Sequence, residues 1–292
     1  MTPDLTPVRL ACFDLDETLL GPDHRPGPRT GLLAPRLADA GIVLAVATGR
    51  APEASRAIAQ ELGAGYLIAV NGAWIGMPDG RLLHHEVIAE PAVAAIVAWL
   101  RERGTPFYLM SPQGYFSDGE GEALEAANRV RGVLPRPLPA ILPPAMKIMP
   151  LGENLPVPPL GPLAAAVEVV QHPEYLEIGP AGVDKATAIK WLSRRLGIAR
   201  REVLCCGDAG NDRRMVEWAG VGVAMGDAQP GVRAVADWIC PPHHEDGTGA
   251  VIAALLEGDR SPVPNEEETV REGVVSDRSG TGIQGRLVQR GR

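Results

Sequence analysis

The chain has 292 residues, of which 45% are hydrophobic and 22% charged, so it can bury the core of one large or two modest domains. Its formal net charge of −8 argues against a nucleic-acid-binding surface, which needs basic patches. A small anionic substrate remains compatible with this charge, because local lysines and arginines can hold it.

Two further patterns indicate where the protein works. The first seven residues lack the basic and apolar pattern of a signal peptide, and no apolar stretch is long enough to span a bilayer. The four cysteines form no CxxC pair, which is typical of reduced thiols. We therefore expect a cytoplasmic protein with no membrane partner.

The first 81 residues alternate between apolar, β-branched runs and segments with helical spacing. We expect strands at residues 8–13, 42–47 and 66–70, and helices at 30–40 and 53–62. This order predicts an α/β fold in which helices flank a parallel sheet. In such sheets ligands bind outside the carboxyl ends of the strands.

The alternation stops between residues 82 and 181, where the pattern is mixed and rich in proline. The expected elements are helices at 92–103 and 123–131, and strands at 105–110, 146–149 and 175–178. The prolines between 135 and 162 disrupt any regular pattern there. This region is predicted to be a separate α+β insertion.

The first pattern returns at Asp184 and ends near residue 257. We expect helices at 185–196, 213–218, 232–236 and 249–256, and strands at 203–206, 221–225 and 238–240. Residues 258–292 are rich in Pro, Glu, Ser, Gly and Arg, which predicts a disordered tail.

Two carboxylates follow the first predicted strand. Asp14 and Asp16 are two residues apart and project to the same side if the strand continues, with Thr18 just beyond them. Carboxylates this close repel each other, so they need a shared proton or a cation such as Mg²⁺. The alternative is a strand exit with two solvated aspartates.

Polar residues also follow the next two strands. Thr48 could donate to a phosphoryl oxygen or cap a helix, and Arg50 could clamp an anion with both arms or form a surface salt bridge. Asn71 follows the third strand. All of these residues fall at the same predicted edge of the sheet.

Two more candidates come from the third part of the chain. Asp208, Asn211 and Asp212 lie in a loop of small residues that would let oxygen ligands approach a metal, although Asn211 or Asp208 could simply cap the helix at 213–218. Lys185 stands at a helix start, where it could bind an anion or lie solvated on the surface.

Together these motifs resemble those of the haloacid dehalogenase (HAD) superfamily, and most closely its Cof-type phosphatases with a type IIB cap. The matching segments are residues 14–18 (DLDET), 48–50 (TGR), 71–73 (NGA), Lys185, 207–212 (GDAGND), 223–228 (VAMGDA) and 245–247 (EDG). The likeness covers roughly residues 8–256. It implies a Rossmann-like core of residues 8–81 and 182–257, with a cap domain of residues 82–181.

Three positions depart from the usual pattern of the family. Glu17 stands where the family usually has Gly, Asp227 where it often has Asn, and Arg233 where it often has Lys. The longer acidic side chain of Glu17 could narrow the pocket or disfavour very anionic substrates.

The resemblance also implies roles for the motif residues. Asp14 would attack phosphorus, Asp16 would act as general acid and base, and Thr48 and Lys185 would stabilise the phosphoryl oxygens. Substrate contacts are expected from Gly49, Arg50 and Asn71. The implied ligands of Mg²⁺ are Asp14, Asp16 through its backbone carbonyl, Asp208, Asn211 and Asp212.

These expectations converge on a Mg²⁺-dependent phosphatase of small phosphorylated metabolites, with sugar phosphates among the candidates, that forms an aspartyl-phosphate intermediate. The alternatives are a phosphomutase or phosphotransferase on the same scaffold, or a non-catalytic regulator that binds a phosphorylated metabolite. The expected partner is the metabolite alone, with no nucleic acid and no membrane, and the protein is expected to be a monomer or a homodimer.

Overall fold

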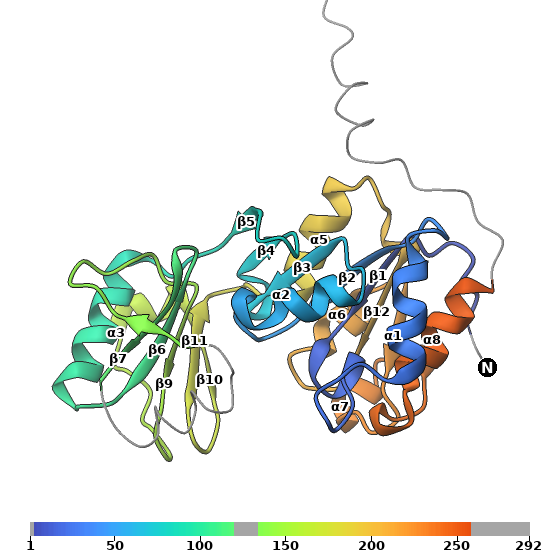
Figure 1. The fold of residues 1–292 in the computed structure, drawn as a ribbon. Helices are drawn as coiled ribbons and strands as arrows, with labels where there is room; N and C mark the ends of the chain where they lie inside the picture. Colours follow the sequence, from blue (N-terminus) through green and yellow to red (C-terminus); the bar gives the residue numbers. More distant parts are fainter. Residues whose placement is uncertain (1–2, 120–133, 258–292) are drawn as a thin grey trace, which may run out of the picture. The chain divides into compact units, whose positions relative to one another are not determined.

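The computed structural model describes residues 3–119 and 134–257, which contain two β-sheets (Figure 1). The helix expected at 123–131 and the tail expected at 258–292 lie outside the described residues.

The larger sheet has eight strands, and N-terminal strands lie beside C-terminal ones within it (Figure 1). The order across the sheet is β14 (Trp238–Ile239), β13 (Val221–Ala224), β12 (Val203–Gly207), β1 (Leu10–Phe13), β2 (Val43–Ala47), β3 (Tyr66–Ala69), β4 (Trp74–Gly76) and β5 (Leu82–His85). The strands from β14 to β3 run parallel, and β4 and β5 add an antiparallel edge.

β1 lies in the middle of this sheet and is buried along its whole length. Leu10 lies beside Val43 of β2 on one side and Val203 of β12 on the other. A strand covered on both faces reads as a continuous apolar run, which explains why the sequence predicts it well.

Helices from both halves of the chain flank the larger sheet. They are α1 (Pro28–Leu33), α2 (Pro52–Glu61), α5 (Lys185–Arg195), α6 (Arg213–Trp218), α7 (Pro230–Arg233) and α8 (Gly247–Leu256). α1 packs against α8, and α5 packs against α6. The helix expected at 30–40 is α-helical only to Leu33 and continues as a 3-10 turn, Ala34–Leu37, because Pro35 has no N–H for the α-helical ladder.

The smaller sheet has six strands and is covered by α3 (Glu90–Glu102). The order is β10 (Val167–Gln171), β11 (Leu176–Pro180), β9 (Lys147–Pro150), β6 (Phe107–Ser111), β7 (Gly114–Asp118) and β8 (Arg136–Pro137). Its pairs are antiparallel except for β7 with β8. The region from β6 to β11 is called the cap sheet below.

The cap sheet has two different faces, since successive residues of a strand point to opposite sides. In β6, Phe107 and Leu109 share a buried cluster with α3, whereas Tyr108 and Met110 belong to the cluster of the larger sheet. The cap sheet therefore turns one face to its own helix and the other to the core.

The predicted fold class is confirmed, because helices flank a mainly parallel sheet and an α+β region lies between β5 and α5 in the chain. β4, β5, β7, β8 and β10 were not expected, and all of them except β4 lack a continuous apolar run. The division at 82–181 stays a prediction, although β5, just beyond residue 81, pairs with β4 in the larger sheet.

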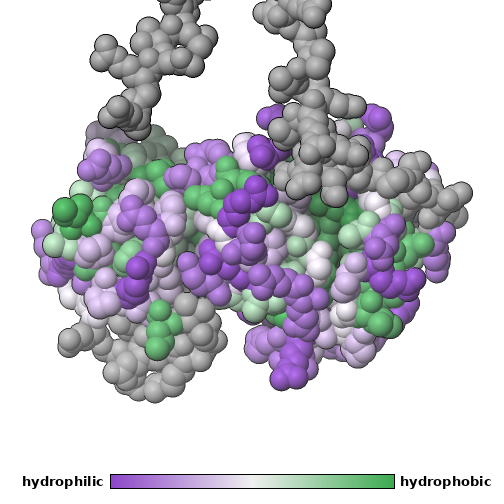
Figure 2. Space-filling model, turned by 45° about the horizontal axis from the view of Figure 1, so that its top comes forward, coloured by the Kyte–Doolittle hydropathy of each residue, from purple (hydrophilic) through white to green (hydrophobic). Residues whose placement is uncertain are grey.

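Among the described residues, no helix is both long and apolar enough to cross a membrane. The face seen in Figure 2 mixes hydrophilic and hydrophobic residues. All four cysteines lie in the described part and are buried thiols, as the lack of CxxC pairs predicts.

Candidate active site

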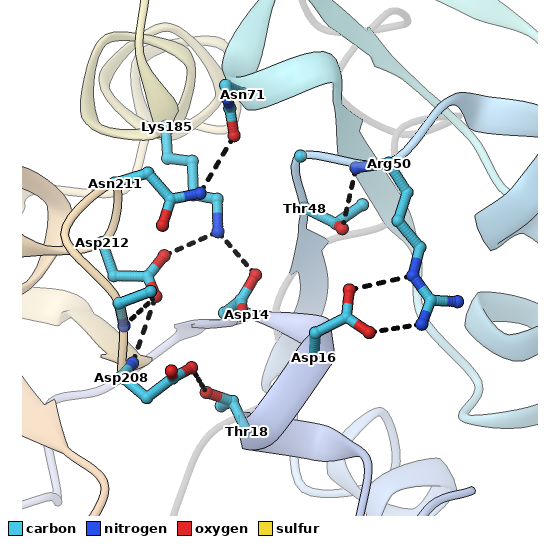
Figure 3. Close-up of polar contacts among 12 residues, drawn as sticks. Asp14, Asp16, Thr18, Thr48, Arg50, Asn71, Lys185, Asp208, Asn211 and Asp212 are labelled. Atoms are coloured by element: carbon cyan, nitrogen blue, oxygen red, sulfur yellow. Dashed lines mark hydrogen bonds and ion pairs between the residues drawn. The ribbon is translucent and has the colours of Figure 1, made fainter. Parts of the chain in front are cut away.

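The functional groups lie at the carboxyl ends of parallel strands in the larger sheet (Figure 3). Asp14 follows β1 directly, and its N–H donates to the carbonyl of Cys206 in β12 at 2.9 Å. Thr48 follows β2, and its N–H donates to Ile68 of β3 at 2.8 Å. These bonds extend the sheet ladder by one residue and so fix where each side chain begins.

Lys185 lies at the centre of the site and is 1% exposed. Its Nζ donates to Asp14 Oδ1 at 2.5 Å and to Asp212 Oδ1 at 2.6 Å (Figure 3). Lys185 is the first residue of α5, which Asp184 caps by accepting the N–H of Thr187 at 2.7 Å. The cap sets the direction of the helix and hence the direction from which the ammonium enters.

Asp208 and Asp212 occupy the loop after β12. Asp208 accepts the hydroxyl of Thr18 at 2.9 Å, while Asp212 Oδ2 accepts the N–H groups of Asp208 and Ala209 at 3.1 and 3.0 Å. Asp212 stands directly before α6, and its side chain makes no capping bond to that helix. A side chain at Gly207 would lie 2.5 Å from the side chain of Asp212, which explains the glycine there.

The electrostatics of this cluster are unbalanced. Burial, together with repulsion from Asp212, raises the pKa of Asp14 well above its ordinary value and that of Asp208 to about 6. Burial lowers the pKa of Lys185, but attraction to Asp14 and Asp212 outweighs this effect, so its pKa is raised and it stays charged. Three buried carboxylates thus face a single ammonium.

This imbalance fits a divalent cation. Asp14, Asp208 and Asp212 each offer a carboxylate oxygen, and these three atoms lie within 4.8 Å of one another. All of the donors are hard oxygens, which is the ligand type that Mg²⁺ prefers. The acidic cluster can therefore hold a metal ion.

Asp16 points away from this cluster. Its carboxylate accepts both arms of Arg50, one through Nε at 2.8 Å and the other through Nη2 (Figure 3). The side chain of Asp16 is 44% exposed. Thr48 is buried beside this pair, and its hydroxyl accepts the N–H of Arg50 at 3.1 Å.

Asn71 connects the other side of the site. Its Oδ1 accepts the amide of Asn211 at 3.0 Å, and its Nδ2 donates to Glu177 of β11 at 3.0 Å. Asn71 and the preceding Val70 both have a φ near +54°, which is strained for a β-branched residue. A side chain at Gly49 would come within 2.9 Å of Asn71 Oδ1, so Gly49 leaves room for this amide.

Glu17 also has a left-handed backbone, with a φ of 55°. This conformation explains why the HAD superfamily usually has glycine at this position, since glycine adopts it without the steric cost that a side chain carries. The charge of Glu17 is among the smaller causes that raise the pKa of Asp208.

A cavity of about 560 Å³ opens beside these residues. Asn71, Lys185 and Asn211 line it from the core, and the cap sheet contributes Lys147, Glu168, Tyr175 and Glu177. The rings of His172 and Tyr175, which both line the cavity, stack with their centroids 4.2 Å apart.

Lys147 is a site residue that the sequence analysis missed. It is 3% exposed, and its Nζ lies 3.1 Å from the carboxylate of Glu177 and donates to the carbonyl of Gly49 at 3.3 Å. Its signal was present in the sequence, because a single lysine interrupts the apolar run of residues 145–149.

The geometry can be compared with known proteins. A family model described as haloacid dehalogenase-like hydrolase matches residues 11–133 and 165–252, which is most of the chain. The chain belongs to this family. The resemblance seen in the motifs is thereby confirmed, and the chain is a HAD-type phosphatase.

Similar proteins include one curated relative and two solved structures. The HMP-PP phosphatase of Cronobacter sakazakii is 32% identical over 236 residues, which are 76% of this chain and 86% of the relative. A haloacid dehalogenase-like hydrolase from Bacteroides thetaiotaomicron shares 25% identity with a TM-score of 0.76, over 84% of this chain and 98% of its own. A subclass IIB sugar phosphatase of the superfamily has the same fold, with 24% identity and a TM-score of 0.70 over 84% and 98%.

Proposed function

We propose that this chain is a Mg²⁺-dependent phosphatase that hydrolyses small phosphorylated metabolites through an aspartyl-phosphate on Asp14. The observation that carries the proposal is the buried triangle of Asp14, Lys185 and Asp212, with Asp208 beside it. It places one nucleophilic oxygen, one fixed positive charge and a set of metal-binding oxygens at a single point.

Asp14 supplies the nucleophile in this mechanism. One of its oxygens forms a bond to phosphorus while the bond from phosphorus to the leaving oxygen breaks. Burial disfavours the ionised form of Asp14, and Lys185 opposes this effect from 2.5 Å. Thr48 and Lys185 would then stabilise the phosphoryl oxygens as charge moves onto them.

Asp16 moves the proton. It would protonate the leaving oxygen in the first step and, in the second, accept the proton of the water that attacks phosphorus and releases Asp14. In the structure the carboxylate of Asp16 is paired with Arg50 through two bonds, so this role requires it to turn from Arg50 towards the leaving oxygen. The 44% exposure of Asp16 gives water access to it, which favours hydrolysis over transfer to a second metabolite.

The proposed ligands of Mg²⁺ are the carboxylates of Asp14 and Asp208 and the backbone carbonyl of Asp16, with Asn211 or Asp212 in support. When bound, the ion offsets the repulsion between carboxylate and phosphate. The raised pKa values of Asp14 and Asp208 support this assignment, because a nearby cation would stabilise the ionised carboxylates that burial and mutual repulsion disfavour.

The leaving group would occupy the cavity next to the cap sheet. Gly49, Arg50 and Asn71 are the proposed substrate contacts of the core, and Lys147 and Glu177 would meet the leaving group from the cap. HMP-PP is a candidate because a curated relative is named for it. Sugar phosphates remain candidates, because polar side chains such as Glu168, Glu177 and Asn211 line part of the cavity.

We extend the proposal to the setting of the enzyme. The cap would comprise residues 82–181, the enzyme would be cytoplasmic, and it would act as a monomer or homodimer without nucleic-acid or membrane partners. The acidic net charge of −8 supports the absence of a nucleic-acid partner.

The test is a screen of the purified full chain against phosphorylated metabolites, including HMP-PP and sugar phosphates, with and without Mg²⁺. Released phosphate is measured, and an aryl phosphate serves as a generic substrate. We expect turnover of at least one metabolite that stops when Mg²⁺ is removed. Release that is independent of metal, or no release from any compound, would contradict the proposal.

A further inference from the structure

A second group of metal-ligand side chains lies on two neighbouring loops of the larger sheet. Asp227 follows β13, while His243 and His244 lie in the 3-10 turn His243–Glu245 after β14. β13 and β14 are parallel neighbours, so their carboxyl ends meet at one edge of the sheet. The two histidines are adjacent in the sequence and lie 16 and 17 residues after Asp227.

The three side chains converge on one point. His243 Nδ1 lies 2.5 Å from Asp227 Oδ2, and His244 Nδ1 lies 3.6 Å from the same oxygen. One ligand atom from each residue lies within 4.8 Å of the other two. Around a tetrahedral Zn²⁺ with bonds of about 2.0–2.1 Å, neighbouring ligand atoms are about 3.3 Å apart. The observed separations bracket that spacing, so small side-chain rotations bring all three onto one ion.

The backbone holds the two loops together. The N–H of His243 donates to Asp227 Oδ1 at 3.3 Å, and the N–H of Gly226 donates to the carbonyl of Pro241 at 3.4 Å. A side chain at Gly247 would lie 1.9 Å from that same carbonyl, so the chain is packed closely there. These two loops therefore need little further ordering when a ligand binds.

We propose that Asp227, His243 and His244 form a binding site for one divalent transition-metal ion of the Zn²⁺ type. Two imidazole nitrogens and one carboxylate oxygen suit Zn²⁺, Co²⁺ or Ni²⁺, whereas Mg²⁺ prefers oxygen ligands throughout. The site is therefore chemically different from the all-carboxylate cluster of Asp14, Asp208 and Asp212. Three protein ligands leave at least one coordination position for water.

Access and position agree with this assignment. The side chain of His243 is 17% exposed and that of His244 is 54% exposed, so an ion reaches the site without any opening of the fold. The turn that carries both histidines contacts the turn Leu15–Leu19, which contains Asp16. A bound ion ties the ends of β13 and β14 together beside the loop of the active site, and so raises the thermal stability of the protein.

The experiment titrates Zn²⁺ into the full chain by calorimetry, after chelator treatment and in excess Mg²⁺ so that the carboxylate cluster is already occupied. We expect one Zn²⁺ per chain, and a loss of affinity of about tenfold or more in His243→Asn and in His244→Asn. His84→Asn is the matched control. This histidine lies outside the site, where its Nε2 is 2.9 Å from the carboxylate of Glu86, so its replacement should leave the Zn²⁺ affinity unchanged.

A second measurement guards against misfolded variants. His244 is the most exposed ligand, so His244→Asn should keep its far-UV circular dichroism, and Co²⁺ should give a visible absorption spectrum in the wild type that this variant loses. The proposal is overturned if the wild type binds no Zn²⁺ in excess Mg²⁺. It is also overturned if the double variant of His243 and His244 binds Zn²⁺ as tightly as the wild type.

Discussion

The two sheets of this protein present functional groups in different ways. The larger sheet places them at the ends of its parallel strands, where Asp14, Thr48 and Asp208 follow three neighbours. The cap sheet places them along one face, where Lys147 and Glu177 lie on paired antiparallel strands. Strand ends can bring side chains from distant parts of the sequence to one point, whereas a sheet face spreads them over an area. The arrangement at the strand ends suits bond making and breaking, and the arrangement on the sheet face suits selection of a leaving group.

Removing the nucleophile at the end of β1 should have the largest effect. Asp14→Asn should lower phosphate release from an aryl phosphate by about 10⁴-fold or more, because an amide cannot form the acyl phosphate. Asp39→Asn, an exposed aspartate outside the site, should leave the rate unchanged. Equal turnover by Asp14→Asn and wild type, with both folded by circular dichroism, would end the assignment.

Removing the buried ammonium tests whether the strand ends depend on it for stability. Lys185→Met leaves Asp14 and Asp212 buried and facing each other, so the free energy of unfolding should fall by about 3–5 kcal/mol without Mg²⁺. The loss is measured by urea denaturation at neutral pH. Added Mg²⁺ should restore part of it, and a variant as stable as wild type in the absence of metal would contradict the role given to Lys185.

The pH dependence of metal binding tests the carboxylate cluster. The pKa of Asp208 is raised to about 6, so below that pH a proton competes with Mg²⁺ and affinity should fall by up to about tenfold per pH unit. In the metal-free protein this carboxyl binds its proton more tightly when folded than when unfolded. Its ionisation therefore destabilises the fold above about pH 6, and the destabilisation disappears as the pH falls towards 4. Calorimetry at several pH values measures the Mg²⁺ affinity, and thermal unfolding measures the stability. A flat Mg²⁺ affinity from pH 5 to 7.5 would refute the predicted competition between the proton and the metal.

A cap substitution tests the other half of the comparison. Glu177→Gln should lower kcat/KM by about tenfold for the best metabolite, while the rate with a small aryl phosphate changes little, because the cap face meets only the leaving group. Glu174→Gln, on an exposed position of the same region, is the matched control. Equal losses for both substrates would mean that Glu177 acts on the chemistry itself.

The smallest expected effect concerns Glu17. Glu17→Gly should raise the free energy of unfolding by about 1 kcal/mol, because glycine adopts the left-handed conformation at that position without steric cost. Denaturation in urea measures the gain, and a destabilised variant would show that the side chain of Glu17 makes a contact worth more than the strain.

The same contrast explains how much could be predicted from the sequence. Parallel strands buried on both faces read as apolar runs, so β1, β2, β3 and β12 were placed within two residues of their ends. Asp14 and Asp208 followed from these strands because polar residues directly after a parallel strand must lie at one edge.

The remaining contacts of the site depended on information that the spacing of residues along the sequence does not contain. The pairing of Asp16 with Arg50 is a choice of side-chain rotamer, and both residues could equally have faced a ligand. Lys147 and Glu177 became neighbours only through the pairing of β9 with β11, two strands separated by a proline-rich segment. The amide of Asn211, a predicted Mg²⁺ ligand, donates to Asn71, a contact that only the folded loop reveals.

The left-handed backbone at Glu17 has a consequence for how the sequence can change over time. Glutamate and glycine codons differ by a single base, so the unstrained alternative is one mutational step away. A library of random variants selected only for resistance to heat should therefore find glycine at position 17 early and repeatedly. A library selected for turnover of the natural substrate would show whether the glutamate in the active-site loop contributes to activity.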